Sequence, residues 1–174
     1  MKPLQPRSSS AASSVAPQTA TEPKHTQVGD GSRRIVVLVV DDDQGDCELI
    51  SRAFDDCGAQ VDLRFAPDGE AAIEYLANCR RGHQERPRLV LLDLNVPKMD
   101  GKATLRLIRD DPAFKALPVI VFTASEREAD VLKCYQYGAN SYFTKPTDLG
   151  GYRKVIRILE SYWLRRAELP PDTL

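Results

Sequence analysis

The sequence has 174 residues, of which 42% are hydrophobic, and its 24 basic residues nearly balance its 25 acidic ones. This length suits one ordinary domain with a sizeable core, and the even charge gives no sign of a nucleic-acid or membrane partner. No stretch approaches the ~20 apolar residues that cross a bilayer, and the N-terminus lacks the apolar segment of a secretory signal. We therefore expect a cytoplasmic protein without a nucleic-acid or membrane partner.

Cysteine and histidine residues are too scattered to form a metal or catalytic site. The four cysteines stand at positions 47, 57, 79 and 134, without a CxxC or similar spacing. His25 precedes the expected folded part, and His83 falls in a polar stretch. We expect reduced thiols, and neither zinc binding nor histidine-based catalysis.

The composition changes abruptly near residue 33. Residues 1–32 are rich in Ser, Ala, Pro, Thr and Gln with almost no large apolar side chains, so we expect a disordered N-terminal tail. We expect the folded domain over residues 33–170 and a short C-terminal tail over 171–174. Because only eleven residues follow the last expected helix, which ends at 163, we expect no attached output domain.

Short apolar runs alternate with helical patterns along the folded part. The run IVVLVV at 35–40 is apolar throughout, which is typical of a strand covered on both faces. Helices are expected where apolar residues recur every three or four positions, as at Cys47, Ile50 and Phe54. We expect strands over 35–40, 61–66, 89–94, 118–125 and 141–143, and helices over 47–57, 72–79, 102–110, 126–137 and 152–163.

Five alternating strand and helix units imply an α/β fold. Right-handed crossovers then favour one parallel sheet with helices on both faces. In the fourth expected helix, Ala129, Leu132 and Tyr135 share one face. In folds of this class, ligands bind at the carboxyl ends of the strands, so the candidate site is expected there.

The carboxyl ends of the expected strands carry the residues that suggest chemistry. One edge of the sheet gathers acids, an amide, a hydroxyl and an amine: Asp41, Asp42, Asp43, Asp93, Asn95, Thr123 and Lys145. Carboxylates brought together repel one another unless a cation intervenes. Oxygen ligands without His or Cys favour Mg²⁺, which we expect Asp42, Asp93 and the backbone carbonyl of Asn95 to hold.

Asp93 is the best-placed nucleophile of this set. A carboxylate forms an acyl phosphate when the incoming phosphoryl group is charge-neutralised and aligned. Lys145 would supply a positive charge to one phosphoryl oxygen, and Thr123 a hydroxyl donor to another. Thr123 on its own could be an ordinary strand residue, and only its agreement with the other strand ends favours a functional role.

Four motifs together resemble the receiver domain of bacterial response regulators: VLVVDDD, LVLLDLNVPKMDG, VIVFTAS and SYFTKP. The resemblance covers residues 34 to about 168. It implies a flavodoxin-like, doubly wound five-stranded parallel sheet of order 2-1-3-4-5. The chain would be a two-component phosphoacceptor switch, phosphorylated on Asp93 by a sensor histidine kinase with Mg²⁺. It would catalyse only its own phosphotransfer and autodephosphorylation, and would signal through protein contacts.

The same resemblance implies a role for each matched residue. Asp41 and Asp42 would be the acidic pair that binds the metal together with Asp93 and Asn95. Thr123 and Tyr142 would be the switch residues that couple phosphorylation to a surface rearrangement. Tyr142 is equally well interpreted as a plain core residue.

A narrower similarity is to the small single-domain regulators that partner bacterial phytochromes. It rests on the polar loop at 80–88, the TAS after the fourth strand and the ending SYWLRRAELP. It implies a photoreceptor histidine kinase as the donor and a homodimer formed through the last helices and strand. Tyr152, Tyr162 and Trp163 fit a core and dimer contact better than a cofactor platform.

Two other functions fit an α/β fold with an acidic edge. A Mg²⁺-dependent hydrolase or phosphatase usually needs a second acid two residues after its nucleophile, where this chain has Asn95. A flavodoxin-like cofactor binder needs a phosphate-binding loop after the first strand, where DDDQGD would repel phosphate unless a metal intervened. The phosphoacceptor switch is therefore the favoured function.

Overall fold

The computed structural model describes residues 34–171, so the expected N-terminal tail and the last three residues lie outside the described range. All five expected strands and five expected helices are present in the expected order. In chain order the elements are β1 (Ile35–Val40), α1 (Gln44–Asp56), β2 (Val61–Ala66), α2 (Gly69–Arg80), β3 (Leu89–Leu92), α3 (Gly101–Asp110), β4 (Val119–Thr123), α4 (Glu128–Gln136), β5 (Ser141–Thr144), α5 (Leu149–Leu159) and the π-helix η1 (Glu160–Leu164).

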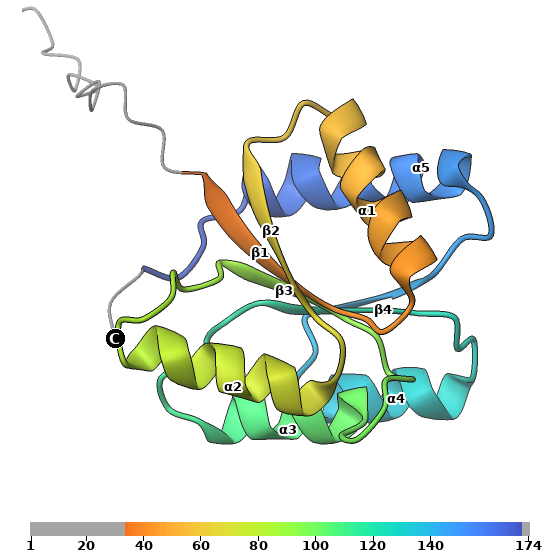
Figure 1. Ribbon diagram of the computed structural model, residues 1–174. Coiled ribbons are helices and arrows are strands. Elements are labelled where there is room, and N and C mark those ends of the chain that lie inside the picture. The colour runs from red at the N-terminus through yellow and green to blue at the C-terminus, as the bar shows by residue number, and fades with distance from the viewer. Residues whose placement is uncertain (1–33, 172–174) are drawn as a thin grey trace, which may run out of the picture. The chain divides into compact units, whose positions relative to one another are not determined.

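The strands form one parallel sheet in the order β2-β1-β3-β4-β5 (Figure 1). This order and the alternation of strands with helices confirm the flavodoxin-like, doubly wound architecture. The first strand, β1, lies inside the sheet next to its edge; the chain then adds β2 at that edge and returns past β1 to add β3, β4 and β5 on the other side. The order therefore reverses beside β1, and the carboxyl ends of β1 and β3 flank this switch point.

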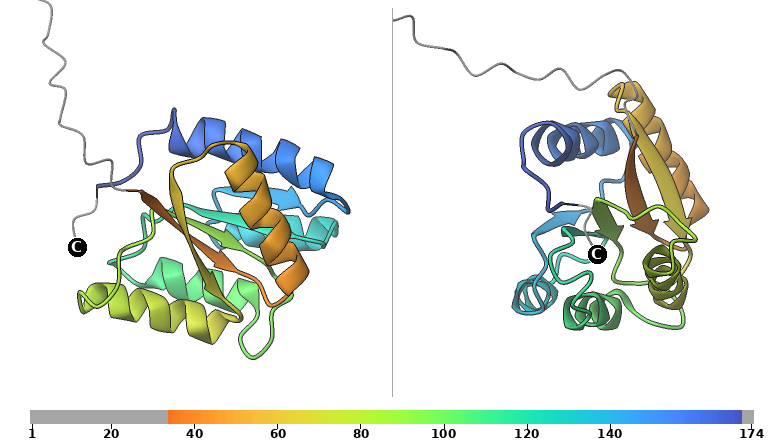
Figure 2. Two further views of the ribbon diagram at one scale, coloured as in Figure 1. Left: turned by 45° about the horizontal axis from the view of Figure 1, so that its top comes forward. Right: turned by 90° about the vertical axis from the view of Figure 1, so that its left-hand side faces the viewer.

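Helices cover both faces of the sheet, with α1 and α5 on one face and α2, α3 and α4 on the other (Figure 2). Alternate residues of β1 point into the two resulting cores. Val37 and Val39 pack with residues of α1 and α5, whereas Leu38 and Val40 pack with residues of α2 and α3. This double burial explains why the sequence of β1 is apolar throughout.

Aspartates begin four of the five α-helices. In each case the side chain accepts a hydrogen bond from a backbone N–H in the first turn, which satisfies a donor that has no partner within the helix. The four capping residues are Asp43, Asp68, Asp100 and Asp148. All four lie in loops that leave the carboxyl end of a strand, namely β1, β2, β3 and β5, so the caps also fix the backbone around the expected site.

The apolar face expected for α4 points away from the core. Leu132 is 61% exposed and Tyr135 is 50% exposed, while Asp130 and Cys134 of the same helix are buried. The spacing of apolar residues correctly predicted a helix, but it could not tell which surface the apolar face would cover. Asp130 is tolerated on the inner side because its carboxylate meets the Lys102 ammonium of α3 at 2.8 Å.

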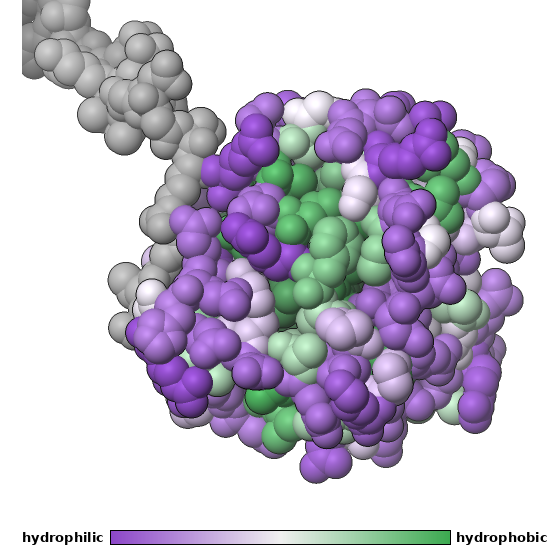
Figure 3. Space-filling model, viewed as in Figure 1, coloured by the Kyte–Doolittle hydropathy of each residue, from purple (hydrophilic) through white to green (hydrophobic). Residues whose placement is uncertain are grey.

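Two properties of the surface bear on partners. No helix within residues 34–171 combines the length and apolar character needed to cross a membrane. The face seen in Figure 3 shows apolar residues over the β1 and β2 side of the sheet, surrounded by polar ones. Phe65, on the edge strand β2, is 44% exposed.

Candidate functional site

Parallel pairing brings the ends of β1 and β3 side by side. Val40 is in register with Leu92, and the N–H of Asp93 donates to the carbonyl of Val40 at 2.9 Å. The next residues, Asp41 and Asp93, are therefore neighbours at this edge, where they are only 4% and 7% exposed. The backbone of α3 packs closely against this edge at Gly101. Any residue with a Cβ at this position would place that atom 2.2 Å from the Asp93 carbonyl oxygen, which is too close.

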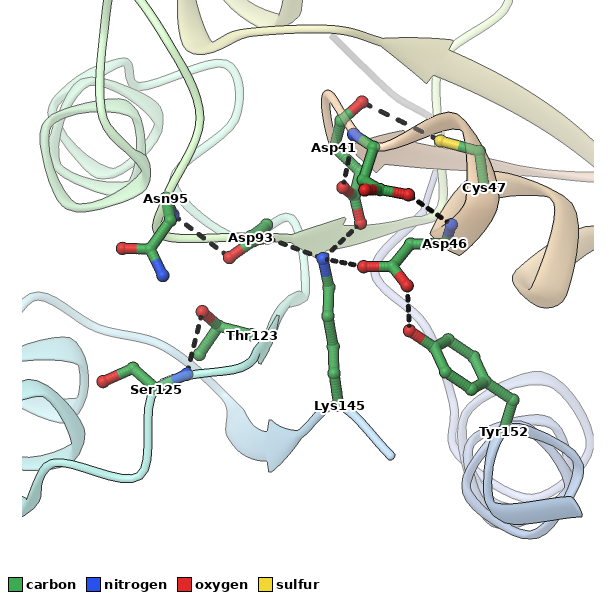
Figure 4. A network of polar contacts seen from close by, with 10 residues as sticks. Asp41, Asp46, Cys47, Asp93, Asn95, Thr123, Ser125, Lys145 and Tyr152 are labelled. Carbon is green, nitrogen blue, oxygen red and sulfur yellow. Dashed lines mark hydrogen bonds and ion pairs between the residues drawn. The ribbon is translucent and has the colours of Figure 1, made fainter. Parts of the chain in front are cut away.

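Lys145 reaches this edge from the end of β5. Its N–H donates to the carbonyl of Thr123 at 2.8 Å, which extends the pairing of β4 with β5 by one residue. Its side chain is 6% exposed, and its Nζ lies 2.6 Å from Asp93 Oδ2 and 2.7 Å from Asp41 Oδ2 (Figure 4). The structure thus brings together two acids and one amine that the sequence carries on three separate strands.

A third acid, Asp46, completes this group and was missed by the sequence analysis. Its Oδ2 lies 2.8 Å from Lys145 Nζ, and its Oδ1 accepts a hydrogen bond from the Tyr152 hydroxyl at 2.6 Å. Asp46 is in the first turn of α1, where an acid is usually explained by the helix dipole alone. We call Asp41, Asp46, Asp93 and Lys145 the Lys145 cluster.

Burial and hydrogen bonding act differently on the members of the cluster. Burial raises the pKa of Asp41 above its ordinary value, and the hydrogen bond from Lys145 offsets only part of this rise. Burial acts on Asp93 too, but hydrogen bonds from Lys145, Thr123 and the Asn95 N–H hold the pKa of Asp93 below its ordinary value. Burial by itself would lower the pKa of the Lys145 ammonium. Its hydrogen bonds to the three carboxylates have the larger effect and raise that pKa. Asp93 and Lys145 are therefore charged at neutral pH.

The two expected switch residues are linked through Ser125. Thr123 is completely buried, and its Oγ1 accepts from the Ser125 N–H at 3.4 Å. The Tyr142 hydroxyl donates to the Ser125 carbonyl at 2.8 Å. Ser125 also donates from its own hydroxyl to Asp130 of α4 at 2.6 Å, so the β4–α4 loop connects the site to α4. Ser125 is the serine of the TAS motif, and nothing in that short motif distinguishes the serine as a functional residue.

Asp42 follows Asp41 in the chain, Asn95 stands two residues after Asp93, and both are exposed. The Asn95 N–H donates to Asp93 Oδ1 at 3.1 Å. Within residues 34–171, no three His, Cys, Asp or Glu side chains form a ready-made metal site. Mg²⁺ does not need one, because it usually keeps several waters and binds proteins through one or two carboxylates. The donors here are oxygens, and three carboxylates face one ammonium, so the chemistry of the site fits a hard divalent cation.

Comparison with known proteins establishes the family. The response regulator receiver domain model matches residues 37–157. The chain therefore belongs to the response regulator receiver domain family, as its four motifs predicted. It is 37% identical over 138 residues to the response regulator Rcp1 of Synechocystis sp., an alignment that covers 78% of this chain and 92% of Rcp1.

Solved structures place the chain near phytochrome-associated regulators. The phosphorylated cyanobacterial phytochrome response regulator RcpA superposes with a TM-score of 0.75 at 33% identity, covering 80% of this chain and 100% of RcpA. The Mn²⁺-bound form of Rcp1 superposes with a TM-score of 0.73 at 36% identity, covering 79% of this chain and 99% of that structure. The similarity to regulators that partner phytochromes, expected from the sequence, is confirmed.

Proposed function

We propose that this response regulator accepts a phosphoryl group from a sensor histidine kinase onto Asp93, with Mg²⁺, and signals through protein contacts. The observation that carries the proposal is the Lys145 ammonium, which lies 2.6 Å from Asp93 and 2.7 Å from Asp41 at the carboxyl edge of the sheet. A buried ammonium beside a nucleophilic carboxylate supports phosphoryl transfer to that carboxylate, because it can stabilise negative charge on the transferring group.

The transfer itself needs little beyond alignment and charge. An oxygen of the ionised Asp93 carboxylate forms the new bond to phosphorus. The bond from phosphorus to the donor histidine nitrogen of the kinase breaks, and its electron pair stays on that nitrogen. Lys145 neutralises one phosphoryl oxygen, and the Thr123 hydroxyl donates a hydrogen bond to another.

The metal would be held by oxygen atoms on the same side of the sheet. Asp41, Asp42 and Asp93 offer carboxylates, and Asn95 offers its backbone carbonyl. When bound, Mg²⁺ neutralises negative charge on the acids and on phosphate oxygens. The solved Mn²⁺-bound form of Rcp1 supports a divalent cation in this chain.

Phosphorylation would act on the surface through the β4–α4 loop. A hydrogen bond from Thr123 to the phosphoryl group would draw the Thr123 hydroxyl away from the Ser125 N–H, its partner at 3.4 Å. Ser125 also holds the Tyr142 hydroxyl and Asp130, so its movement would be felt in β5 and α4. In this account the protein catalyses only its own phosphotransfer and autodephosphorylation.

The partners we propose are a phytochrome-type histidine kinase and a second copy of the chain. The similarity to RcpA, a phytochrome response regulator solved in its phosphorylated form, supports a kinase of this type. The dimer would use the last helices and strand, where large apolar side chains are exposed. They are Leu132, Tyr135, Ile158 and Tyr162, each at least half exposed.

The test is intact-mass measurement of the full chain after incubation with acetyl phosphate and MgCl₂. One phosphoryl group should be added, and hydroxylamine should remove it because an acyl phosphate is attacked by amines. Asp93→Asn should abolish the addition. Asp55→Asn, which changes an exposed acid of α1, should leave it unchanged. Addition that persists in Asp93→Asn would overturn the assignment.

A further inference from the structure

The three carboxylates of the Lys145 cluster are held in two different ways. Each gives one oxygen to Lys145, and each has its other oxygen bound elsewhere (Figure 4). The second oxygens of Asp41 and Asp93 accept from backbone N–H groups two residues further along, both at 3.1 Å. The second oxygen of Asp46 instead accepts from the Tyr152 hydroxyl of α5 at 2.6 Å. Asp46 is therefore fixed to α5, whereas Asp41 is fixed within its own loop, and Asp93 within its own loop and by Thr123 of β4.

Tyr152 is a rigid anchor for this contact. Its side chain is 1% exposed, and it packs in the core between the sheet, α1 and α5. Its ring meets Phe122 edge to face, with 5.5 Å between ring centroids and 80° between ring planes. Phe122 precedes Thr123 in β4, so the hydroxyl that holds Asp46 is fixed relative to the strand that ends at the site.

The number of donors on Lys145 gives Asp46 a distinct role. An ammonium has three N–H groups, and the three carboxylates take all of them. When Lys145 turns toward a phosphoryl oxygen, one carboxylate must lose its bond. The Asp46 side chain is 27% exposed, against 2% for Asp41 and 8% for Asp93, and it keeps Tyr152 as a donor. Losing Lys145 is therefore least costly at Asp46.

We propose that Asp46, held by Tyr152, positions the Lys145 ammonium against Asp93 and releases it to the incoming phosphoryl group. The inference rests on the proposed phosphoacceptor function and adds two positioning residues to it. Asp46 acts directly on Lys145, and Tyr152 acts only through Asp46. Neither residue touches the phosphoryl group.

The first test measures the rate of Asp93 phosphorylation in the full chain against acetyl phosphate concentration with MgCl₂. Tyr152→Phe keeps the ring packing and removes only the hydroxyl. Its maximal rate should fall roughly tenfold, the effect of one hydrogen bond to a charged group, at an unchanged half-saturating donor concentration. Tyr75→Phe removes a hydroxyl that donates to the Glu85 carbonyl at 2.8 Å, outside the Lys145 cluster, and should behave as wild type. Equal rates for Tyr152→Phe and wild type would overturn the inference.

A double-mutant cycle separates this role from a structural one. Asp46→Ala should slow phosphorylation at least as much as Tyr152→Phe, and adding Tyr152→Phe to Asp46→Ala should change nothing further. If the two substitutions together slowed phosphorylation by the product of their separate effects, Tyr152 would not act only through Asp46. If the wild-type chain itself accepts no phosphoryl group, the proposed function fails, and this inference fails with it.

A readout without any phosphodonor completes the test. The Lys145 ammonium protons, observed by ¹⁵N NMR, should exchange with water faster in Tyr152→Phe than in wild type, because Asp46 is then no longer fixed. Tyr75→Phe again serves as the control. Unchanged exchange in Tyr152→Phe would show that the tyrosine does not position Lys145.

Discussion

Two lysines near the carboxyl edge of the sheet differ in burial and in the number of carboxylates that they meet. Lys145 is 6% exposed and meets three carboxylates, whereas the Lys98 side chain is 59% exposed and meets one, that of Asp68, at 2.6 Å. Asp68 also caps α2 by accepting from the Ala71 N–H at 2.8 Å. At Lys98 each charge has one partner, and the pair ties the loop after β3 to the start of α2.

The difference separates a site built for stability from one built for chemistry. The single ion pair between Lys98 and Asp68 is sufficient to hold the loop after β3 against the start of α2. At Lys145 the buried negative charge exceeds the positive charge, which costs stability because close carboxylates repel one another in a poorly solvated place. An excess of this kind is expected where a cation and a phosphoryl group are to be bound.

The largest expected effect comes from removing the ammonium of the unbalanced site. Lys145→Met should slow phosphorylation of Asp93 by at least about 100-fold, since it removes a charge that stabilises the transferring group. It should also lower the free energy of unfolding by about 3 kcal/mol, because three acids are left without their partner. Rates come from intact mass and stability from urea unfolding at neutral pH.

Lys115→Met, which changes an exposed lysine, is the matched control and should show neither effect. Wild-type stability in Lys145→Met would mean that the three acids do not depend on the ammonium. The contrast between Lys145 and Lys98 would then disappear.

Neutralising a single carboxylate should change the free energy of unfolding by an intermediate amount. The change should have opposite signs for Asp41 and Asp93. The pKa of Asp41 is raised above its ordinary 3.8, so ionised Asp41 opposes folding at neutral pH. Asp41→Asn should therefore increase the free energy of unfolding at pH 7. The gain should shrink as pH falls through the raised pKa and vanish below 3.8, where wild-type Asp41 is protonated in both states.

Asp93→Asn should change stability in the other direction. The pKa of Asp93 is lowered, so its ionised form favours folding above the ordinary carboxyl value of 3.8, and this contribution is lost as pH falls through the lowered pKa. The variant should be less stable than wild type at pH 7 and approach it in acid. Urea unfolding over a range of pH measures both variants, and shifts of the same sign would refute the different surroundings assigned to the two acids.

The smallest expected effect is at the balanced pair. Asp68→Ala removes a helix cap and the partner of Lys98, so the midpoint of thermal unfolding should decrease. Phosphorylation of Asp93 should stay within about twofold of wild type, because Asp68 lies outside the Lys145 cluster. Glu70→Ala, an exposed acid in the same helical turn, controls for lost charge. A large loss of phosphorylation would show that the Lys98 pair belongs to the site.

Local sequence patterns predicted most of the fold. The run IVVLVV predicted β1 at its observed bounds, because a strand buried on both faces must be apolar at every position. The face of α4 was harder, since Leu132 and Tyr135 follow a helical spacing whether they face the protein's own core or another surface. The strand at 89–94 was expected two residues too long, because apolar Leu94 continues the buried pattern after the β3 pairing ends at Leu92.

The candidate site was predictable where its residues end strands. Asp41, Asp93 and Lys145 follow strands whose pairing in the sheet was expected, so their meeting followed from topology. Asp46 and Tyr152 could not be found in this way. They lie on α1 and α5, 106 positions apart, and only the packing of these helices brings them together. A hydrogen bond between two helices has no counterpart in local spacing.

Chemical mapping of the modified residue shows most directly whether Asp93 is the phosphoacceptor. The phosphorylated chain is reduced with borohydride, which converts an aspartyl phosphate to homoserine, and the product is sequenced by tandem mass spectrometry. We expect homoserine at position 93 and unchanged aspartate at 41, 42 and 46. Homoserine at any of these three positions, or its absence from position 93 in a chain that carries the phosphoryl group, would contradict the account.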